Sequence, residues 1–176
     1  YGLSFEHKEV RSPLYDEWKP VNKPGFHVLL AHGGDLSCCP MDFTGLAAAG
    51  FDYVALGHSH KPHTVCRDKI AYSGSLEPLD RNDLGKHGYI QGEYEDGNVK
   101  VRLVPCANRS YQNLVLNVDR DTTQYKLEEM LRSEVMRRGG RNIYRLILKG
   151  RVSPDNVLLT ERLHGLGNLV TADCMR

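Results

Sequence analysis

The chain has 176 residues, of which 40% are hydrophobic, so it can form one ordinary domain or two small ones with a real core. Its net charge of +1 excludes the strong basic field of a tight nonspecific nucleic-acid binder. It contains no run of about 18 apolar residues, and we therefore expect no transmembrane helix. Five irregularly spaced cysteines favour reduced thiols in a cytoplasmic protein.

The first part of the chain predicts two parallel strands joined by a helix. Residues 1–5 alternate and indicate an edge strand, followed by a proline-rich connecting loop. Residues 26–32, FHVLLAH, form an apolar run typical of a strand buried on both faces. A short helix over 41–50 and a strand over 53–57 follow. Strand–helix–strand order predicts that the strands at 26–32 and 53–57 are neighbours in one sheet.

Antiparallel structure is expected next. Residues 63–67 and 69–75 predict a hairpin around Asp68. Residues 88–105 predict a second hairpin, whose turn is formed by residues 96–98 with the sequence Asp-Gly-Asn.

The residues from 108 onward predict a separate β-α-β-α-β unit. Its expected elements are a strand over 111–118, an amphipathic helix over 121–138, a strand over 142–150, a helix over 153–165 that starts at an N-cap Ser153, and a strand over 169–174. Apolar residues at helical spacing should face the strand at 142–149; they are Leu127, Leu131 and Val135. We expect this strand to pair with neither 26–31 nor 53–57.

Three histidines stand where predicted strands end: His32 after one strand, and His58 and His60 after the next. Carboxyl ends of neighbouring parallel strands meet at one sheet edge, where ligands bind. A single strand-end histidine is more often a hydrogen-bonded rim residue, but three at one edge favour a metal site. Imidazoles suit Zn, Mn and Fe, and affinity alone does not select among them. Asp35 is the nearest acid and could support a ligand from behind.

The other five histidines are interpreted as structural or solvated, with His63 a candidate to support a ligand. They are His7, His27, His63, His87 and His164.

Several segments in this order resemble the SbcD-type DNA repair exonucleases of the calcineurin-like metallophosphoesterase superfamily. They are FHVLLAHGG, GFDYVALGHSHKPHTV, IAYSGSLEP and KHGYI. The resemblance implies an α/β (α+β) fold: the C-terminal part of a phosphoesterase β-sandwich flanked by helices over 1–107, and a small β-α-β-α-β capping domain over 108–176.

The resemblance also implies two divalent metals, Mn above all, with His32 and His58 on one and His60 on the other. In the family the other ligands come from an N-terminal half that carries Asp-x-His, Gly-Asp and Gly-Asn-His motifs in turn, and this set, including the histidine that protonates the leaving group, does not occur here. The chain is thus expected to be an internal piece of a longer protein, with no catalytic residue of its own. Alone it should hydrolyse nothing and bind at most one adventitious ion.

Three functions stay open at this stage. The first is part of a metal-dependent DNA exonuclease, homodimeric when intact and working with an SbcC-type ATPase. The second is a small-molecule phosphoesterase of the same superfamily, and the third a non-catalytic assembly module that contacts a partner chain. For the first, the candidate phosphate contacts are Arg81, Lys86 and Arg109.

Overall fold

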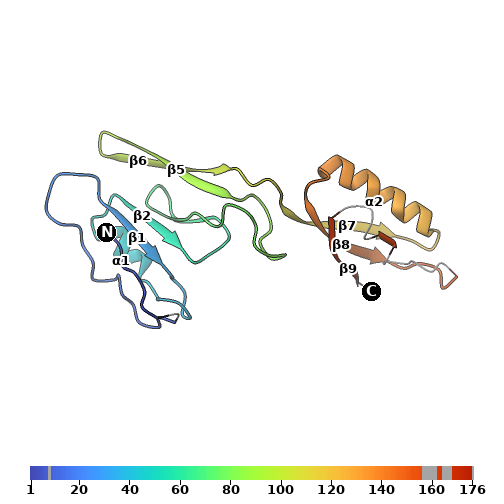
Figure 1. Ribbon diagram of the computed structural model, residues 1–176, viewed down its shortest axis with the longest axis horizontal. Helices are drawn as coiled ribbons and strands as arrows, with labels where there is room; N and C mark the ends of the chain where they lie inside the picture. Colours follow the sequence, from blue (N-terminus) through green and yellow to red (C-terminus); the bar gives the residue numbers. More distant parts are fainter. Residues whose placement is uncertain (8, 156–161, 164–167, 176) are drawn as a thin grey trace. The chain divides into compact units, whose positions relative to one another are not determined.

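The structure is a computed structural model that describes residues 1–7, 9–155, 162–163 and 168–175. The chain divides into two compact units, and most of their elements are labelled in Figure 1. The first unit comprises Tyr1–Leu76 and His87–Cys106, and the second comprises Glu77–Lys86 and Ala107–Arg176. Residues 77–86 therefore group with the second unit, which no sequence pattern had indicated. The mixed α/β class predicted from the sequence is confirmed.

The first unit contains a four-stranded sheet in the order β1-β2-β4-β3. Its strands are β1 (Val28–His32), β2 (Tyr53–Gly57), β3 (His63–Cys66) and β4 (Ile70–Tyr72), and helix α1 (Phe43–Ala48) joins β1 to β2. Strands β1 and β2 are parallel, as the strand–helix–strand order predicts, and β3 runs antiparallel to β4. Helix α1 begins after its N-cap Asp42, whose carboxylate accepts a hydrogen bond from the Thr44 backbone N–H.

The core of the first unit lies on one face of this sheet. Leu29 and Ala31 of β1 are buried in it, together with Leu46 of α1. The apolar run at 26–32 predicted burial on both faces, but Leu30, on the opposite face, is 61% exposed. Within the described residues, nothing packs over Leu30 closely enough to bury it. The expected edge strand at 1–5 is reduced to one bridge between Gly2 and Leu30.

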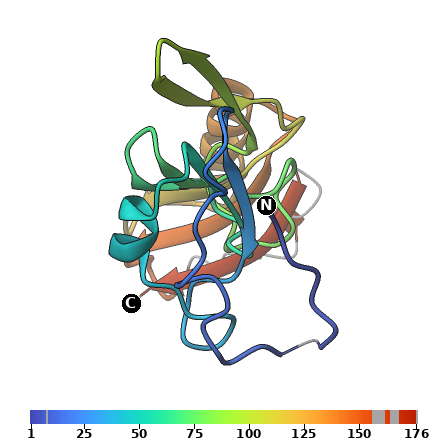
Figure 2. The same ribbon diagram turned by 90° about the vertical axis from the view of Figure 1, so that its left-hand side faces the viewer.

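The second hairpin is confirmed. Strands β5 (Gly88–Glu95) and β6 (Asn98–Pro105) pair along their whole length and form a separate two-stranded ribbon, seen in Figure 2. Asp96 and Gly97 both have positive φ, at 49° and 79°. Tight hairpin turns need this conformation because it matches the twist of the flanking strands.

The second unit has its own sheet, with parallel strands in the order β7-β8-β9, and its described residues include one long helix. The elements are β7 (Tyr111–Val118), α2 (Gln124–Arg138), β8 (Ile143–Gly150) and β9 (Asn168–Met175). Strand β8 pairs with β7 and β9, so the expectation that it pairs with neither strand of the first unit is confirmed. The predicted helix over 153–165 lies largely outside the described residues, and Pro154 and Asp155 form a turn.

Helix α2 starts three residues later than predicted because Thr123 is its N-cap and accepts a hydrogen bond from the Lys126 backbone N–H. As expected, it buries the side chains of Leu127, Leu131 and Val135. They form a core cluster with Tyr144, Leu146 and Leu148 of β8. The second unit thus has a hydrophobic core of its own.

Candidate metal centre

The parallel register of β1 and β2 brings His32 and His58 together. His32 lies opposite Gly57, the residue before His58. Gly57 leaves the space open, because a Cβ there would lie 3.0 Å from Nδ1 of His32. The centroids of the two imidazole rings are 5.3 Å apart. The sheet edge chosen from the sequence thus holds two of the three predicted ligands within reach of one ion.

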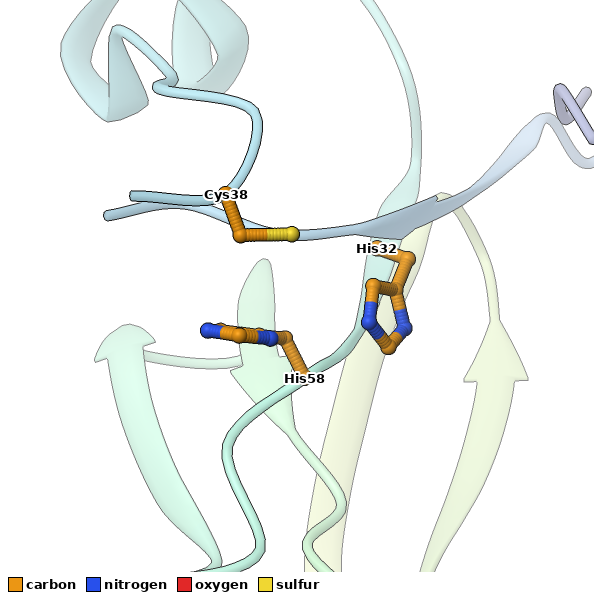
Figure 3. Close-up of side chains that lie close together, drawn as sticks. All are labelled: His32, Cys38 and His58. Carbon is orange, nitrogen blue, oxygen red and sulfur yellow. The ribbon is translucent and has the colours of Figure 1, made fainter. Parts of the chain in front are cut away.

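The third member of this group is Cys38, which the sequence analysis did not select. One possible ligand atom from each of His32, Cys38 and His58 lies within 4.8 Å of the others. Figure 3 shows the Cys38 side chain above the His58 ring, with the His32 ring beside them. The sequence offered one indication of this role: Cys38 follows the strand-end His32 closely, after the pair Gly33 and Gly34. No metal-binding spacing of two cysteines accompanied it.

The loop after β1 folds back to place Cys38 there. Gly33 has a φ of 126°, and a Cβ on it would lie 2.5 Å from the Cys38 carbonyl oxygen. The Gly34 backbone N–H donates to that same oxygen, with a donor–acceptor distance of 2.9 Å. The Tyr72 hydroxyl of β4 donates to the Gly33 carbonyl at 2.7 Å. A residue without a side chain is therefore required at position 33.

Asp35 links this loop to His58. Its Oδ1 accepts hydrogen bonds from the backbone N–H groups of Ser37 and Cys38, at 2.8 and 2.9 Å, and from the Ser37 hydroxyl. Its Oδ2 lies 2.8 Å from Nε2 of His58. The bonds from Ser37, and then the bond with His58, hold the pKa of the Asp35 carboxyl well below its usual range. An ionised carboxylate only accepts, so Nε2 of His58 is the donor.

This bond determines which nitrogen of His58 can bind a metal. With the proton on Nε2, Nδ1 keeps a free lone pair. A carboxylate behind a ligating histidine is the usual arrangement at protein metal sites. Desolvation by the surrounding protein, and then the neighbouring His58, lower the pKa of the His32 ring and favour its neutral form. Two imidazoles with a supporting carboxylate fit a divalent metal of the kind that the family resemblance implies.

His60 is not part of the three-residue group. Its side chain is exposed, and its carbonyl oxygen accepts a hydrogen bond from the Ser75 backbone N–H at 3.0 Å. The Ser75 hydroxyl lies 3.1 Å from Nδ1 of the buried His87. The YSGS and KHGYI segments therefore hold the loop that carries His60. Its assignment to a second metal stays a prediction.

The three candidate phosphate contacts, Arg81, Lys86 and Arg109, are exposed residues of the second unit. The segments that carry them, 77–86 and 107–109, are hydrogen-bonded to each other, because the Glu77 carboxylate accepts hydrogen bonds from Asn108 at 2.7 and 3.0 Å.

His63, the candidate to support a ligand, stacks on Tyr72 with ring centroids 4.4 Å apart.

The four cysteines whose side chains are described are free thiols. They are Cys38, Cys39, Cys66 and Cys106, and this finding agrees with the expected reduced state.

We predict that Asp35→Asn lowers the affinity for Zn²⁺ by roughly 10–100-fold, the usual cost of losing a ligand's hydrogen-bonding partner. The asparagine oxygen can still accept from Ser37 and Cys38. Its NH₂ would donate to Nε2 of His58 and leave the proton on Nδ1, which then cannot bind. Competition with a chromophoric chelator measures the effect.

The control for this prediction is Asp96→Asn, at the exposed tip of the β5–β6 hairpin, which should bind Zn²⁺ like the wild type. Equal affinities for Asp35→Asn and Asp96→Asn would contradict the role given to Asp35.

One comparison with known proteins points to the same superfamily as the sequence resemblance. The chain is 22% identical over 161 residues to an uncharacterized metallophosphoesterase, YhaO, of Bacillus subtilis. The match covers 85% of this chain but only 40% of the relative's length. No family model matches. The similarity supports the calcineurin-like metallophosphoesterase superfamily, and the α/β fold is compatible with it. Among the described residues, no helix is both long and apolar enough to cross a membrane.

Proposed function

We propose that the first unit supplies part of the metal site of a metal-dependent phosphoesterase. The observation that carries this proposal is the pair His32 and His58 at the carboxyl ends of adjacent parallel strands, with Asp35 behind His58. Ligand sites of open parallel sheets lie at this edge. The similarity to a metallophosphoesterase supports the same assignment.

The residues of this chain would hold a divalent ion and orient the side chains that bind it. A bound divalent ion would polarise the phosphoryl oxygens and lower the pKa of a bound water. His32 and His58 would fix the ion at the sheet edge, and Asp35 would keep His58 in its ligating tautomer. The Ser75 backbone would hold the loop so that His60 can serve a neighbouring position.

The test is hydrolysis of bis(p-nitrophenyl) phosphate by the protein that carries these residues, with Mn²⁺ or Zn²⁺ added. We expect metal-dependent turnover that falls by at least about 100-fold in His58→Ala, because losing a ligand should exceed the cost of losing its supporting partner. His7→Ala, at an exposed loop position, is the matched control and should keep full activity. Turnover that is unaffected by His58→Ala would refute the proposal.

For the substrate we propose DNA, cut as an exonuclease with an SbcC-type ATPase as partner. In support, the three cationic candidates lie in one compact unit on segments that hydrogen-bond to each other. A nuclease without sequence choice binds through phosphates. Comparing linear duplex DNA with nucleotide monoesters separates this proposal from a small-molecule phosphoesterase, which the metal site fits equally well.

Charge reversal tests the DNA contact. The variant Arg81→Glu, Lys86→Glu, Arg109→Glu should weaken DNA binding at low salt and reduce the slope of log K against log salt by up to about 2.7, or about 0.9 per phosphate contact. The control makes the same charge change at exposed lysines of the first unit: Lys19→Glu, Lys23→Glu, Lys100→Glu. Fluorescence anisotropy at several salt concentrations measures both. Equal losses in the two variants would point to net charge rather than to a site.

One observation favours the alternative of an assembly module. An apolar hollow of about 330 Å³ lies between β2 and the β5–β6 hairpin of the first unit. Its lining includes Phe26, Tyr53, Ala55, Tyr89 and Tyr94. Such a surface suits contact with another protein. A pull-down with the SbcC-type ATPase that succeeds for wild type and fails for Tyr89→Glu, without any metal-dependent hydrolysis, would support this reading instead.

A further inference from the structure

We propose that Cys38 is a metal ligand, and that its Sγ, with His32 and His58, makes an N₂S site that prefers Zn²⁺ and similar ions over Mn²⁺. The proposal builds on the metal centre described above. It concerns ion binding by this chain, however, and its test does not measure hydrolysis.

The geometry points to one ion shared by the three side chains. Their ligand atoms lie within 4.8 Å of one another. Around a tetrahedral zinc, bonds of about 2.0–2.3 Å place ligand atoms roughly 3.3–3.6 Å apart. Side-chain rotations that move the ligand atoms by about an ångström would bring them to these separations. Cys38 and His58 are half-buried and His32 is exposed, so an ion can enter from solvent.

The loop is built to hold Cys38 in this place. The Asp35 carboxylate accepts from the Cys38 backbone N–H on one oxygen and from His58 on the other. A single side chain therefore positions two of the three ligands. The neighbouring Cys39 is fully buried in the core cluster, which fixes the chain direction and turns Cys38 outward.

Sulfur changes which ion the site selects. Thiolate is a soft ligand suited to Zn²⁺ and comparable ions, whereas Mn²⁺ prefers carboxylate and water oxygens. Binding releases the Cys38 proton to solvent, so the thiolate brings one negative charge to the divalent ion. No electron is transferred and no co-reactant is needed. The bound ion would keep an open fourth position, as catalytic zinc sites do.

Cobalt titration tests the proposal directly, because thiolate-bound Co²⁺ shows a near-ultraviolet sulfur-to-metal charge-transfer band. We expect the wild-type chain to develop this band at one equivalent of Co²⁺, and Cys38→Ser to lose it. Cys106→Ser, which replaces an exposed cysteine, is the matched control and should retain it. Cobalt bound without the band in the wild type, or a band that persists in Cys38→Ser, would overturn the assignment.

A competition between Zn²⁺ and Mn²⁺ measures the preference for one ion over the other, which would not change if Cys38 had only a structural role. Cys38→Ser should lower Zn²⁺ affinity by at least the roughly 10–100-fold that loss of a supporting residue costs, and should change Mn²⁺ affinity much less. Equal losses for both ions would indicate a collapsed loop and refute ligation. Cobalt binding without sulfur would leave the proposed phosphoesterase centre standing, whereas a sulfur-ligated ion without hydrolysis would refute only the proposed activity.

Discussion

Leu131→Ala should lower the free energy of unfolding of the second unit by about 2–5 kcal/mol. Leu131 of α2 is fully buried in the core cluster of the second unit, which also contains Leu127, Leu146 and Tyr144, and truncating it leaves a cavity in that core. Small domains have total stabilities of about 5–15 kcal/mol, so this loss is a large fraction. Urea denaturation followed by circular dichroism measures it.

Met136→Ala is the matched control, on the same helix but with a residue that is 88% exposed. It should change the free energy of unfolding by less than about 0.5 kcal/mol. Because the two units have separate cores, the Leu131→Ala protein should also keep its Zn²⁺ affinity. If Zn²⁺ binding were lost when the second unit unfolds, this result would contradict our proposal that residues 108–176 form a distinct domain.

Gly33→Ala should disrupt the metal centre. The φ of 126° alone costs an alanine about 1–3 kcal/mol. The added Cβ would also lie 2.5 Å from the Cys38 carbonyl oxygen and 2.7 Å from Cys39 Cβ, so the loop must shift. Both Cys38 and Asp35 would then leave their positions, and we expect Zn²⁺ affinity to fall by at least about 100-fold, beyond the cost of losing Asp35 alone.

Gly97→Ala separates the two causes. Gly97 also has a positive φ, of 79°, but a Cβ there would meet nothing within 4 Å. This control should lose stability from the backbone conformation alone and bind Zn²⁺ like the wild type. Thermal unfolding and chelator competition on both variants measure the difference. If Gly33→Ala behaved like Gly97→Ala, the close packing of the loop would not matter for the site.

Local patterns were sufficient for most elements of this chain. Alternation and the Asp-Gly-Asn turn predicted the β5–β6 hairpin, because turn conformation and strand pairing there depend on neighbouring residues only. Helical spacing predicted the buried face of α2. The start of α2 was predicted too early because Asp121, Thr122 and Thr123 are all suitable N-cap residues. The structure shows that Thr123 is the N-cap, since its side chain accepts the hydrogen bond from the Lys126 backbone N–H.

The site was predicted in part, for a similar reason. The order strand–helix–strand determines that His32 and His58 meet, since a parallel crossover brings the two strand ends to one edge. Cys38 could not be found this way. Its place depends on a loop whose course is set by two positive-φ glycines, by the Tyr72 hydroxyl from β4 and by Asp35, contacts between residues far apart in the chain.

The sequence by itself thus determined the class of the fold, the parallel pair β1 and β2, and the histidine pair at its edge, because these follow from short-range periodicity and from the handedness of crossovers. Asp35 was already a candidate from the sequence, but only the tertiary structure decided that its partner is His58 and that Cys38 joins the histidine pair. It alone also decided that residues 77–86 group with the second unit and that one face of β1 leaves Leu30 exposed. These features depend on which loops and layers pack together, and no local pattern encodes that packing.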